Sequence, residues 1–411
     1  MKILLATYWN VPHLGGVWNY MQQLKKSLEE RGHEVDLMGY GEENTIIHKV
    51  NTGEKVEKSK LLPFLQAKFP LYMYPNVYTN KLVEFSEFHR YLFELGATYL
   101  GLEKYDLIHT QDVISTASIK RVKPQNTPLI ATLHGSVAHE IRHQLTTIHQ
   151  SPTSHMAREY YDELERLGAT SSDLTIVANH WLENILRDEF GVPQHQLRVL
   201  HYGFDSEEFI KQKSKQSYID RPINKKVIIY SGRLTELKGV NYLIQALANL
   251  KAIRQDWICW IVGTGDKQEE LQLLTKSLNL DNDISFLGSR DDVPALLSKA
   301  DIYVLPSIIE NQPLSLIEAQ LAGKPSIVSN VGGLPEMIEN NVTGLLVEPK
   351  DVYGLFISLN RLLTDSLFAK NLGENAKKWG MTHWSFENGI RNLLKAYDEV
   401  LLKKKTGDIN G

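Results

Sequence analysis

The sequence contains a single cysteine, Cys259, among its 411 residues. One cysteine excludes a disulfide within the chain, and this one lies in the apolar run "WICWIVG", where we expect a buried thiol. Structural disulfides belong to oxidising compartments, so this composition suits a reducing one. We therefore expect a cytoplasmic protein.

Long apolar runs are also absent. No stretch reaches the roughly 18 to 20 apolar residues of a membrane-spanning helix. The first residues, "MKILLATYWN", lead into a glycine-containing loop. We interpret them as a first strand, because a signal peptide has a longer apolar region and a small-residue cleavage site. At most, peripheral contact with the inner face of a membrane is expected.

Neither sign of charge is in large excess. The chain has 45 Lys and Arg against 49 Asp and Glu, a formal net charge of −4. A nucleic-acid-binding domain usually carries a strong basic excess. We therefore expect no nucleic acid among its partners.

Short apolar runs alternate along the chain with longer segments of helical periodicity. This alternation predicts an α/β fold of parallel sheets with crossover helices, and its restart near residue 225 predicts two such domains, residues 1–204 and 205–382. The polar stretch 205–226 is predicted to link them. The expected strands span residues 2–7, 34–39, 106–110, 128–134, 174–179, 197–203, 226–232, 257–263, 283–288, 301–307, 325–330 and 343–349.

Residues 61–105 are rich in aromatic side chains mixed with Lys and Arg. One interpretation is a set of helices packed on the N-terminal sheet, since aromatic stripes usually form core. The other is an insertion that binds an acceptor or touches a membrane. The aromatics are Phe64, Phe69, Tyr72, Tyr74, Tyr78, Phe85, Phe88, Tyr91, Phe93, Tyr99 and Tyr105.

The stretch "PSIIENQPLSLIEAQLAGKPSIVS" carries two acids, Glu310 and Glu318, after a predicted buried strand. Parallel sheets bind ligands at the carboxyl ends of their strands. Pro313 suits the first position of a helix. The next three residues, Leu314, Ser315 and Leu316, would then present free N–H groups, which form an anion site. Acids on both sides of an anion site suit a ligand with hydroxyls flanking a phosphate, such as a nucleotide sugar, although a solvated surface explains the acids equally well.

Basic residues follow another strand in "SGRLTELKGV". A single cation there would be a solvated surface residue, but Arg233 and Lys238 together suit a diphosphate whose leaving charge must be neutralised. Two glycine loops also follow strands: "VGTGD", with Gly263 and Gly265, and "HLGGVWNY", with Gly15 and Gly16. Each alone is a weak signal, because ordinary tight turns look the same.

These four loops, in this order on two Rossmann-like halves, resemble the retaining glycosyltransferases of family 4, which have the GT-B fold. The resemblance covers nearly the whole chain and is strongest over 225–350, in "SGRLTELKG", "VGTGD", "FLG", "ADIYVLPS", "ENQPLSLIEAQLAGKPSIVSNVGGLPEMI" and "TGLLVEP". The segment "HYGFD" is similar to the family's hinge, and "THWSF" to the point where the last helix crosses back. The resemblance implies two Rossmann-like parallel-sheet domains facing a central cleft. The acceptor-side domain 1–204 would be completed by a C-terminal helix at about 383–403, and 205–382 would bind the nucleotide sugar.

The resemblance also implies residue roles in the second domain. Arg233 and Lys238 would stabilise the leaving diphosphate, Glu310 would hold hydroxyls of the donor sugar, and Glu318 would bind the ribose. The backbone near Arg290 would meet the base. The remaining members of the expected donor site are Gly263, Gly265, Gln312, Pro313, Leu314 and Ser315.

In the first domain the resemblance implies two further contributions. The backbone of Gly15 and Gly16 would close over the diphosphate, and His134 of "TLHGS" would lie near the donor sugar and the reaction centre. The chain departs from the family at Pro313, where glycine is commoner, so the reading of the sugar's 3- and 4-hydroxyls is open. The hinge has His-Tyr in place of Ile-Asn.

Two short patterns suggest metals instead. "HEIRH" (139–143) fits a zinc-binding pair of histidines with Glu140 as base, and His149 or His155 could add ligands. "DND" (281–283) resembles the metal-binding acids of another glycosyltransferase fold, although a solvated turn explains it more simply. We expect neither to be a metal site and expect no cofactor or essential metal.

The sequence thus favours a glycosyltransferase that moves a sugar from a nucleotide diphosphate sugar, expected to be a UDP-sugar, to a hydroxyl acceptor with retention. The acceptor could be a sugar, a lipid-linked molecule or a small molecule in envelope polysaccharide or glycolipid synthesis. Two alternatives remain open here: a nucleotide-sugar epimerase on the same scaffold, and a catalytically silent sugar-binding envelope protein. The sugar, the acceptor and the oligomeric state are not readable from the sequence.

Overall fold

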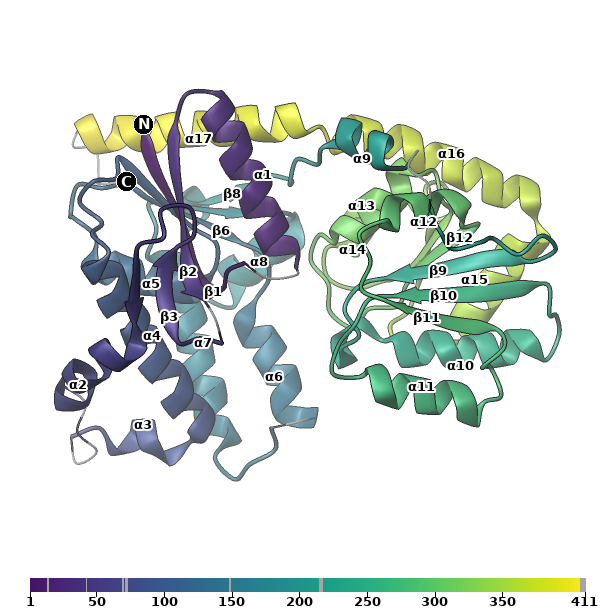
Figure 1. The fold of residues 1–411 in the computed structure, drawn as a ribbon, viewed down its shortest axis with the longest axis horizontal. Helices are drawn as coiled ribbons and strands as arrows, with labels where there is room; N and C mark the ends of the chain where they lie inside the picture. The colour runs from purple at the N-terminus through teal and green to yellow at the C-terminus, as the bar shows by residue number, and fades with distance from the viewer. Residues whose placement is uncertain are drawn as a thin grey trace. The chain divides into compact units, whose positions relative to one another are not determined.

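The computed structural model of the chain describes residues 1–12, 15–41, 43–68, 70, 73–147, 149–213 and 217–406. The chain divides into two compact units (Figure 1). Unit 1 comprises Met1–His201 and Ile390–Gly411, and unit 2 comprises Tyr202–Gly389. Each contains its own sheet and its own hydrophobic core.

The sheet of unit 1 has the strand order β4-β3-β2-β1-β5-β6-β7-β8. The pairs from β2 through β1 to β8 are parallel, and β3 and β4 extend the sheet as an antiparallel hairpin. The strands are β1 (Lys2–Asn10), β2 (Glu34–Gly41), β3 (Ile46–Lys49), β4 (Lys55–Glu57), β5 (Leu107–Thr110), β6 (Leu129–Leu133), β7 (Leu174–Val177) and β8 (Leu197–Val199).

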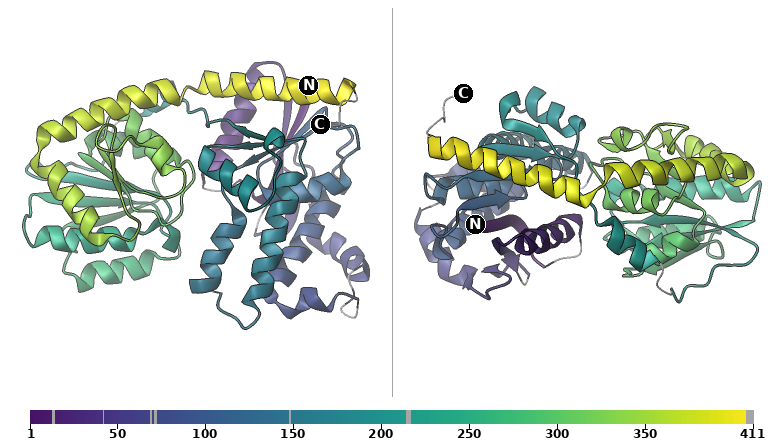
Figure 2. Two further views of the ribbon diagram at one scale, coloured as in Figure 1. Left: turned by 180° about the vertical axis from the view of Figure 1, so that it is seen from behind. Right: turned by 90° about the horizontal axis from the view of Figure 1, so that it is seen from above.

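The helices of unit 1 cover this sheet, with α5 and α7 in such close contact that a Cβ on Gly168 would meet the Val113 carbonyl oxygen at 2.3 Å. They are α1 (Gly16–Glu30), α2 (Lys58–Lys68), α3 (Pro75–Thr79), α4 (Lys81–Tyr99), α5 (Val113–Val122), α6 (Val137–Thr147), α7 (Ser154–Thr170), α8 (His180–Asp188) and the 3₁₀ turn η1 (Gln194–Gln196). The last helix, α17 (Phe386–Thr406), begins in unit 2 and lies along unit 1 from Ile390 onward (Figure 2).

The sheet of unit 2 is wholly parallel, with the order β11-β10-β9-β12-β13-β14. Its strands are β9 (Lys226–Ser231), β10 (Trp257–Val262), β11 (Ile284–Gly288), β12 (Ile302–Leu305), β13 (Ser326–Ser329) and β14 (Leu345–Val347). In β9, the three residues 227–229 are completely buried. Helices cover both faces of a parallel sheet, so its strands are nearly continuous apolar runs.

Helices lie on both sides of this sheet, with α10 and α11 on one side and α12 and α13 on the other (Figure 1). In α10, Val240, Leu243, Ile244 and Leu247 are buried at the spacing of a single helix face. The helices are α9 (Ser206–Lys213), η2 (Glu236–Lys238), α10 (Val240–Lys251), α11 (Gln268–Ser277), α12 (Val293–Lys299), α13 (Leu314–Leu321), α14 (Leu334–Met337), α15 (Val352–Thr364) and α16 (Ser366–His383).

The stretch 205–226, predicted as a linker, is instead part of unit 2. It contains α9, whose Phe209 is buried in the core of unit 2. Further along, the guanidinium of Arg221 forms an ion pair with Asp301 at 2.8 Å. The buried Phe209 and the ion pair of Arg221 therefore attach these parts of the stretch to unit 2, although the composition of the stretch is polar.

The chain passes between the units at 201/202 and at 389/390, a few residues from the expected 204/205 and 382/383. The two passages pair just inside unit 2, where Phe204 forms a β-bridge with Ser385 and its N–H donates to the Trp384 carbonyl at 3.0 Å. This pairing explains why residues 202–204 and 383–389 belong to unit 2.

The aromatic segment 61–105 forms α2, α3 and α4 of unit 1 and is only partly core. Phe93 and Tyr105 are buried, as the packing interpretation expects. Phe64, Phe85 and Tyr99 are more than half exposed. Phe69 and Tyr72 lie outside the described residues, and binding of an acceptor or a membrane by this segment stays a prediction.

Candidate active site

The sheet order of unit 2 creates one point where successive connections run in opposite directions. Strands β9 and β12 are neighbours there, with Ile302 beside Ile228 and Tyr303 beside Ile229. Loops at the carboxyl ends of two such strands diverge and leave room for a ligand. The loop after β9 carries Arg233 and Lys238, and the loop after β12 carries Glu310.

Lys238 and Glu310, predicted from separate motifs, are in contact. The ammonium of Lys238 lies 2.5 Å from Oε2 of Glu310. The same carboxylate accepts hydrogen bonds from the Ser307 hydroxyl at 3.2 Å and from the Asn311 N–H at 3.3 Å. Both charged side chains are more than four-fifths buried. A buried ion pair with additional hydrogen bonds is held in one geometry, as a binding site requires.

The backbone holds the two loops together. The N–H of Ile308 donates to the Leu237 carbonyl at 2.8 Å. Gly239 has a φ of +64°, and a Cβ there would meet the Pro306 carbonyl oxygen at 2.1 Å. Only glycine permits both this conformation and this approach.

Arg233 is exposed, and its position is set by its backbone. Its carbonyl accepts a hydrogen bond from the hydroxyl of the buried Tyr230 at 2.7 Å. Among the described ion pairs none includes the guanidinium of Arg233, so its charge is not neutralised by the protein there. The loop therefore presents one paired cation, Lys238, and one unpaired cation.

The start of α13 differs slightly from the prediction. Pro313 is the N-cap residue, one place before the helix, because α13 begins at Leu314. The N–H of Leu316 is not free as predicted, since it donates to the Pro313 carbonyl at 3.2 Å. The N–H groups of Leu314 and Ser315 have no acceptor in the described protein, and the Ser315 hydroxyl is hydrogen-bonded to Tyr303 at 2.8 Å. Two free donors remain for an anion.

Glu318 lies one turn further along α13 and is half-buried. Burial raises the pKa of its carboxyl group to about 7. Among the described residues this carboxyl group forms no hydrogen bond or ion pair. The carboxylate of Glu310, in contrast, is already engaged by Lys238, Ser307 and Asn311.

Gly263 and Gly265 lie in the loop after β10, whose backbone contacts the loop that carries Arg233. A Cβ on Gly263 would meet the Gly232 carbonyl oxygen at 1.9 Å, and one on Gly265 would meet the Leu234 carbonyl oxygen at 2.3 Å. The N–H of Leu234 donates to the Thr264 carbonyl at 2.9 Å. Packing of the two loops is thus a sufficient reason for both glycines, and their predicted contact with a ligand stays a prediction.

Arg290 follows β11, in the loop 289–292. Its guanidinium forms two parallel hydrogen bonds with Asp292, at 2.6 and 2.7 Å. This arrangement fixes the side chain and the loop. It leaves the backbone near Arg290 for the predicted contact with a base.

Unit 1 has its own point of reversal between β1 and β5. Gly15 is the N-cap of α1 and makes no side-chain cap, and Gly16 is the first helical residue. Asp112, after β5, is buried and accepts hydrogen bonds from the Thr7 hydroxyl and the Tyr8 N–H, both at 2.8 Å. Burial raises the pKa of the Asp112 carboxyl group.

His134 follows β6, as predicted, and is half-buried. Its Nε2 lies 3.0 Å from Oε1 of Gln111, and its ring meets Tyr20 edge-on at 5.2 Å. Burial lowers the pKa of His134 to about 3, so the ring is neutral near pH 7.

Behind this histidine lies a buried polar network that the sequence analysis missed. His109 is hydrogen-bonded to the hydroxyls of Tyr397 and Thr132, both at 2.7 Å, and burial lowers its pKa to about 3. The available signal was the polar run "HTQD" at the end of an otherwise apolar strand, since buried polar groups need partners. In unit 2, Tyr230 and Tyr303 likewise stand as polar groups inside apolar runs, which indicates buried hydroxyls that need hydrogen-bond partners.

The metal alternatives find other partners. Nε2 of His139 lies 3.0 Å from the Glu189 carboxylate. A solvated turn was expected for Asp283. The residue is instead buried and paired with Lys251 at 2.7 Å. Among the described residues no group of three or more His, Cys, Asp or Glu is arranged to hold a metal ion.

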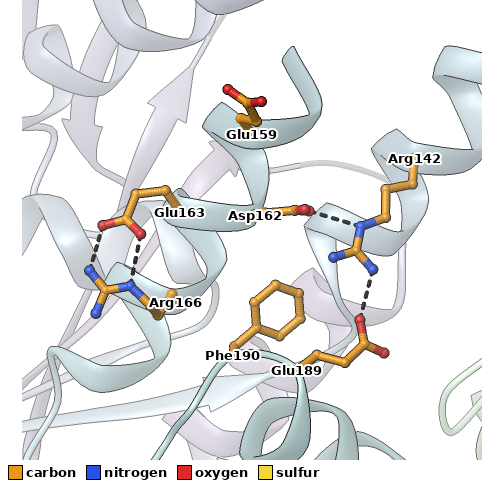
Figure 3. Close-up of a pocket in the computed structure, with 7 residues that line it drawn as sticks. All are labelled: Arg142, Glu159, Asp162, Glu163, Arg166, Glu189 and Phe190. Carbon is orange, nitrogen blue, oxygen red and sulfur yellow. Dashed lines mark hydrogen bonds and ion pairs between the residues drawn. The ribbon is translucent and has the colours of Figure 1, made fainter. Parts of the chain in front are cut away.

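A separate pocket of about 300 Å³ lies in unit 1 among α6, α7 and α8 (Figure 3). Arg142 pairs there with Asp162 and Glu189, both at 2.8 Å, and Arg166 pairs with Glu163. Two arginines and four acids line the pocket, and none of the predicted site residues is among them. Within the described ranges no helix combines the length and apolarity needed to cross a bilayer.

Two Rossmann-like units, with cations, acids and free helix N–H groups gathered at the reversal point of unit 2, define a glycosyltransferase of the GT-B architecture. The solved sucrose-phosphate synthase of Thermosynechococcus elongatus has this fold, with a TM-score of 0.74 at 22% identity, and the match covers 98% of this chain and 99% of that one. The structure of Anabaena HepE in complex with UDP-glucose matches with a TM-score of 0.67 at 20% identity, over 97% and 100%.

Family models cover both units. The family "Glycosyltransferase Family 4" matches residues 14–208, and "Glycosyl transferases group 1" matches residues 211–379. The N-acetyl-alpha-D-glucosaminyl L-malate synthase of Bacillus anthracis is 27% identical over the full length of both chains. The chain belongs to the family of group 1 glycosyltransferases.

Proposed function

We propose that the chain transfers a sugar from a UDP-sugar to a hydroxyl acceptor with retention, in the synthesis of an envelope polysaccharide or glycolipid. One observation carries this proposal: the contact of Lys238 with Glu310 beside the free N–H groups that begin α13. These three features come from two loops that meet at the reversal point of the unit 2 sheet.

The groups suit the parts of a nucleotide sugar. The Lys238 ammonium and the Arg233 guanidinium would neutralise a diphosphate, and the N–H groups of Leu314 and Ser315 would bind one of its phosphates. Glu310 would accept hydrogen bonds from sugar hydroxyls, and Glu318 from the ribose. The HepE structures, one with UDP and one with UDP-glucose, support the choice of a uridine donor.

We further propose front-face substitution. The acceptor oxygen attacks the anomeric carbon on the side from which the diphosphate leaves. The bond to the acceptor forms as the bond to the phosphate oxygen breaks, and the acceptor proton passes to that phosphate. The Glu310 carboxylate is already engaged by Lys238 and Ser307. The protein's part is therefore positioning and stabilisation of the leaving charge.

His134 would lie near the donor sugar and the reaction centre, and the backbone of Gly15 and Gly16 would close over the diphosphate. The neutral imidazole of His134 can donate or accept one hydrogen bond near pH 7, but it carries no charge. The family to which the chain belongs consists of transferases. No observation favours the epimerase or the silent binding protein.

The test is a set of nucleotide sugars incubated with the purified protein, with release of nucleotide as the readout. Lys238→Ala should lower release by about 10³-fold, because a buried cation next to developing charge contributes about 4 kcal/mol to the transition state. Glu310→Ala, which removes the partner of Lys238 and the acceptor for sugar hydroxyls, should lower it by a similar factor. Lys370→Ala, which removes an exposed ion pair on α16, is the control and should keep the rate. Near wild-type release in either site variant, with the circular dichroism spectrum unchanged, would contradict the proposal.

A further inference from the structure

Gln111 is a buried polar residue to which the proposed function gives no role. It directly follows β5 and is 1% exposed. The neighbouring parallel strand β6 ends at Leu133, so His134 leaves the sheet at the same edge. Adjacent parallel strands bring the residues after their carboxyl ends close together. The two side chains are in contact, with Oε1 of Gln111 lying 3.0 Å from Nε2 of His134.

Two further contacts fix the Gln111 residue. Its backbone N–H donates to the Ala6 carbonyl at 2.9 Å, which holds it against β1. Its amide Nε2 donates to the His109 carbonyl at 3.5 Å. A carbonyl only accepts hydrogen bonds, so the amide nitrogen faces His109 and the amide oxygen faces His134.

This orientation of the amide decides which ring nitrogen of His134 carries the proton. An amide oxygen only accepts, so Nε2 of the imidazole must be the donor. In a neutral ring, Nδ1 is then the nitrogen that can only accept. Burial lowers the pKa of His134 to about 3, so the ring is neutral near pH 7 and has a choice of two tautomers.

Polar contacts also fix the strands behind the pair. Thr132, two residues before His134, is hydrogen-bonded through its hydroxyl to Nε2 of His109 at 2.7 Å. Nδ1 of His109 lies 2.7 Å from the hydroxyl of Tyr397 on α17. On the other side, the ring of Tyr20 on α1 meets the His134 ring edge-on at 5.2 Å. The pair is therefore enclosed by β5, β6, α1 and α17.

We propose that Gln111 is a positioning residue, whose amide oxygen fixes the orientation and the tautomer of His134. This inference rests on the proposed function, because that function places His134 near the donor sugar and the reaction centre. A ligand group that meets the imidazole at Nδ1 must then offer a hydrogen, as a sugar hydroxyl does. Gln111 itself touches no substrate and acts through the histidine.

The tautomer can be observed without any turnover. In protein with ¹⁵N-labelled histidines, the protonated and unprotonated ring nitrogens give different NMR signals, and the signals that His134→Asn lacks belong to His134. We expect the proton on Nε2 in the wild type near pH 7. Gln111→Met keeps the length of the side chain and removes the oxygen, so both tautomers should become populated.

The kinetic effect should fall on turnover. A misplaced group at a reaction centre raises the barrier more than it weakens binding. Gln111→Met should therefore lower kcat for nucleotide release by about 10- to 100-fold and change KM for the donor by less than about threefold. In a His134→Asn background, the same substitution should change kcat by less than about threefold, because the residue that Gln111 positions is gone.

Gln196 offers a matched control in the same unit. It is buried, and its Nε2 donates to the Ala169 and Ser172 carbonyls at 3.0 and 2.8 Å. It stands before β8, at the amino end of that strand, and thus at the opposite edge of the sheet. Gln196→Met should lower the melting temperature, as Gln111→Met should. Its kcat and its His134 signals should stay as in the wild type.

Four results would overturn the inference. They are a proton on Nδ1 of His134 in the wild type, an unchanged tautomer in Gln111→Met, an unchanged kcat in His134→Asn, and equal losses from Gln111→Met in both backgrounds. The wild-type spectrum decides the matter even if Gln111→Met does not fold. Failure of the proposed function looks different, because the wild type would then show the expected tautomer and release nucleotide from no sugar nucleotide.

Discussion

Glu310 and Glu318 belong to the same loop and helix, yet their surroundings give them different properties. Glu310 is paired with Lys238 and hydrogen-bonded to Ser307. Glu318 has no such partner, and burial alone raises its pKa to about 7. One acid is therefore engaged by a cation and a hydroxyl, whereas the other changes its charge near neutral pH.

Donor binding should depend on pH through Glu318. Ribose hydroxyls that donate to its carboxyl group favour the ionised form, so affinity for a UDP-sugar should rise as the pH increases through about 7, by up to about tenfold per pH unit below that value. The sugar nucleotide is a suitable probe because its phosphates do not titrate in this range. Calorimetric titrations between pH 5.5 and 8.5 measure the effect, and Glu318→Gln should abolish the dependence. A flat profile in the wild type would remove Glu318 from the ribose site.

The stability of the free protein should show the opposite trend. Unfolded Glu has a pKa near 4.3. Between that value and about 7, the folded chain keeps a proton at Glu318 that the unfolded chain loses. The contribution of this group to stability is thus fully present below about pH 4 and is lost as the pH rises through 7. Glu318→Gln should accordingly gain in melting temperature over wild type at pH 8.5 and match it at pH 5, which also checks that the variant is folded.

Among the elements, the loops after β9 and β10 depend on close backbone contact. The N–H of Gly232 donates to the Val262 carbonyl at 3.0 Å, and the N–H of Leu234 donates to the Thr264 carbonyl at 2.9 Å. No side chain fits between the two loops. The position of Arg233 therefore depends on the absence of side chains in a loop that need not touch the ligand.

Gly265→Ala should disturb this contact without backbone strain of its own, because Gly265 does not have a positive φ. The added methyl group would lie 2.3 Å from the Leu234 carbonyl oxygen. We expect a loss of about 2–3 kcal/mol in the free energy of unfolding and a 10- to 100-fold slower release of nucleotide. Urea denaturation and the release assay measure the two effects.

Gly135→Ala is the control for stability, since the nearest atom to its Cβ would be Oε1 of Glu140 at 3.5 Å, the end of a flexible side chain. Its unfolding should be nearly unchanged. Equal stability of both variants would mean that the two loops in unit 2 can separate without cost.

The elements predicted from the sequence and those observed differ for physical reasons. All twelve predicted strands are present, because a strand that is buried on both faces has a nearly continuous apolar sequence. The strands β3 and β4 were missed, since they are four and three residues long and include Lys49 and Lys55. Helix α9 was missed because Phe209 is its only buried residue.

The candidate site was predictable to the extent that its residues stand in recognisable loops. Arg233, Lys238 and Glu310 follow strands, and neighbouring parallel strands bring their loops to one edge. Supporting groups such as Ser307 could not be predicted, because a hydroxyl in a loop has no distinguishing pattern. The packing of individual side chains is likewise invisible in a sequence. Gln111 follows a predicted strand, but no pattern shows that its amide meets His134. The Gln312 amide is buried without a hydrogen-bond partner among the described residues, and no pattern shows this either.

For the whole molecule, the main feature is that unit 1 is made from both ends of the chain. In α17 the residues Ile390, Leu393, Ala396, Tyr397 and Val400 are buried. The contact is reinforced by an ion pair between Arg198 and Glu399 at 2.6 Å and another between Asp173 and Lys404 at 3.0 Å. Unit 2, in contrast, is one continuous segment.

A chain that ends at residue 389 should therefore lose unit 1 and keep unit 2. A fully buried Ile, Leu or Val side chain contributes about 1.5–3 kcal/mol, so Ile390, Leu393 and Val400 alone approach the lower end of the ~5–15 kcal/mol that stabilises a domain. Scanning calorimetry should show one remaining transition, which a UDP-sugar still shifts upward. A chain ending at residue 406 is the control and should show both transitions. Two intact transitions in the shorter chain would contradict the packing assigned to α17.

Because unit 1 is built from two separate segments of the chain, its two parts are synthesised at different times on the ribosome. Residues 1–201 leave the exit tunnel first, but the surface that receives Leu393, Ala396 and Tyr397 stays uncovered until the final residues have been translated. The segment that forms unit 2 emerges in the meantime and can finish folding earlier. The half of the enzyme that is synthesised first is thus completed last, and during that interval it is the part most in need of a chaperone.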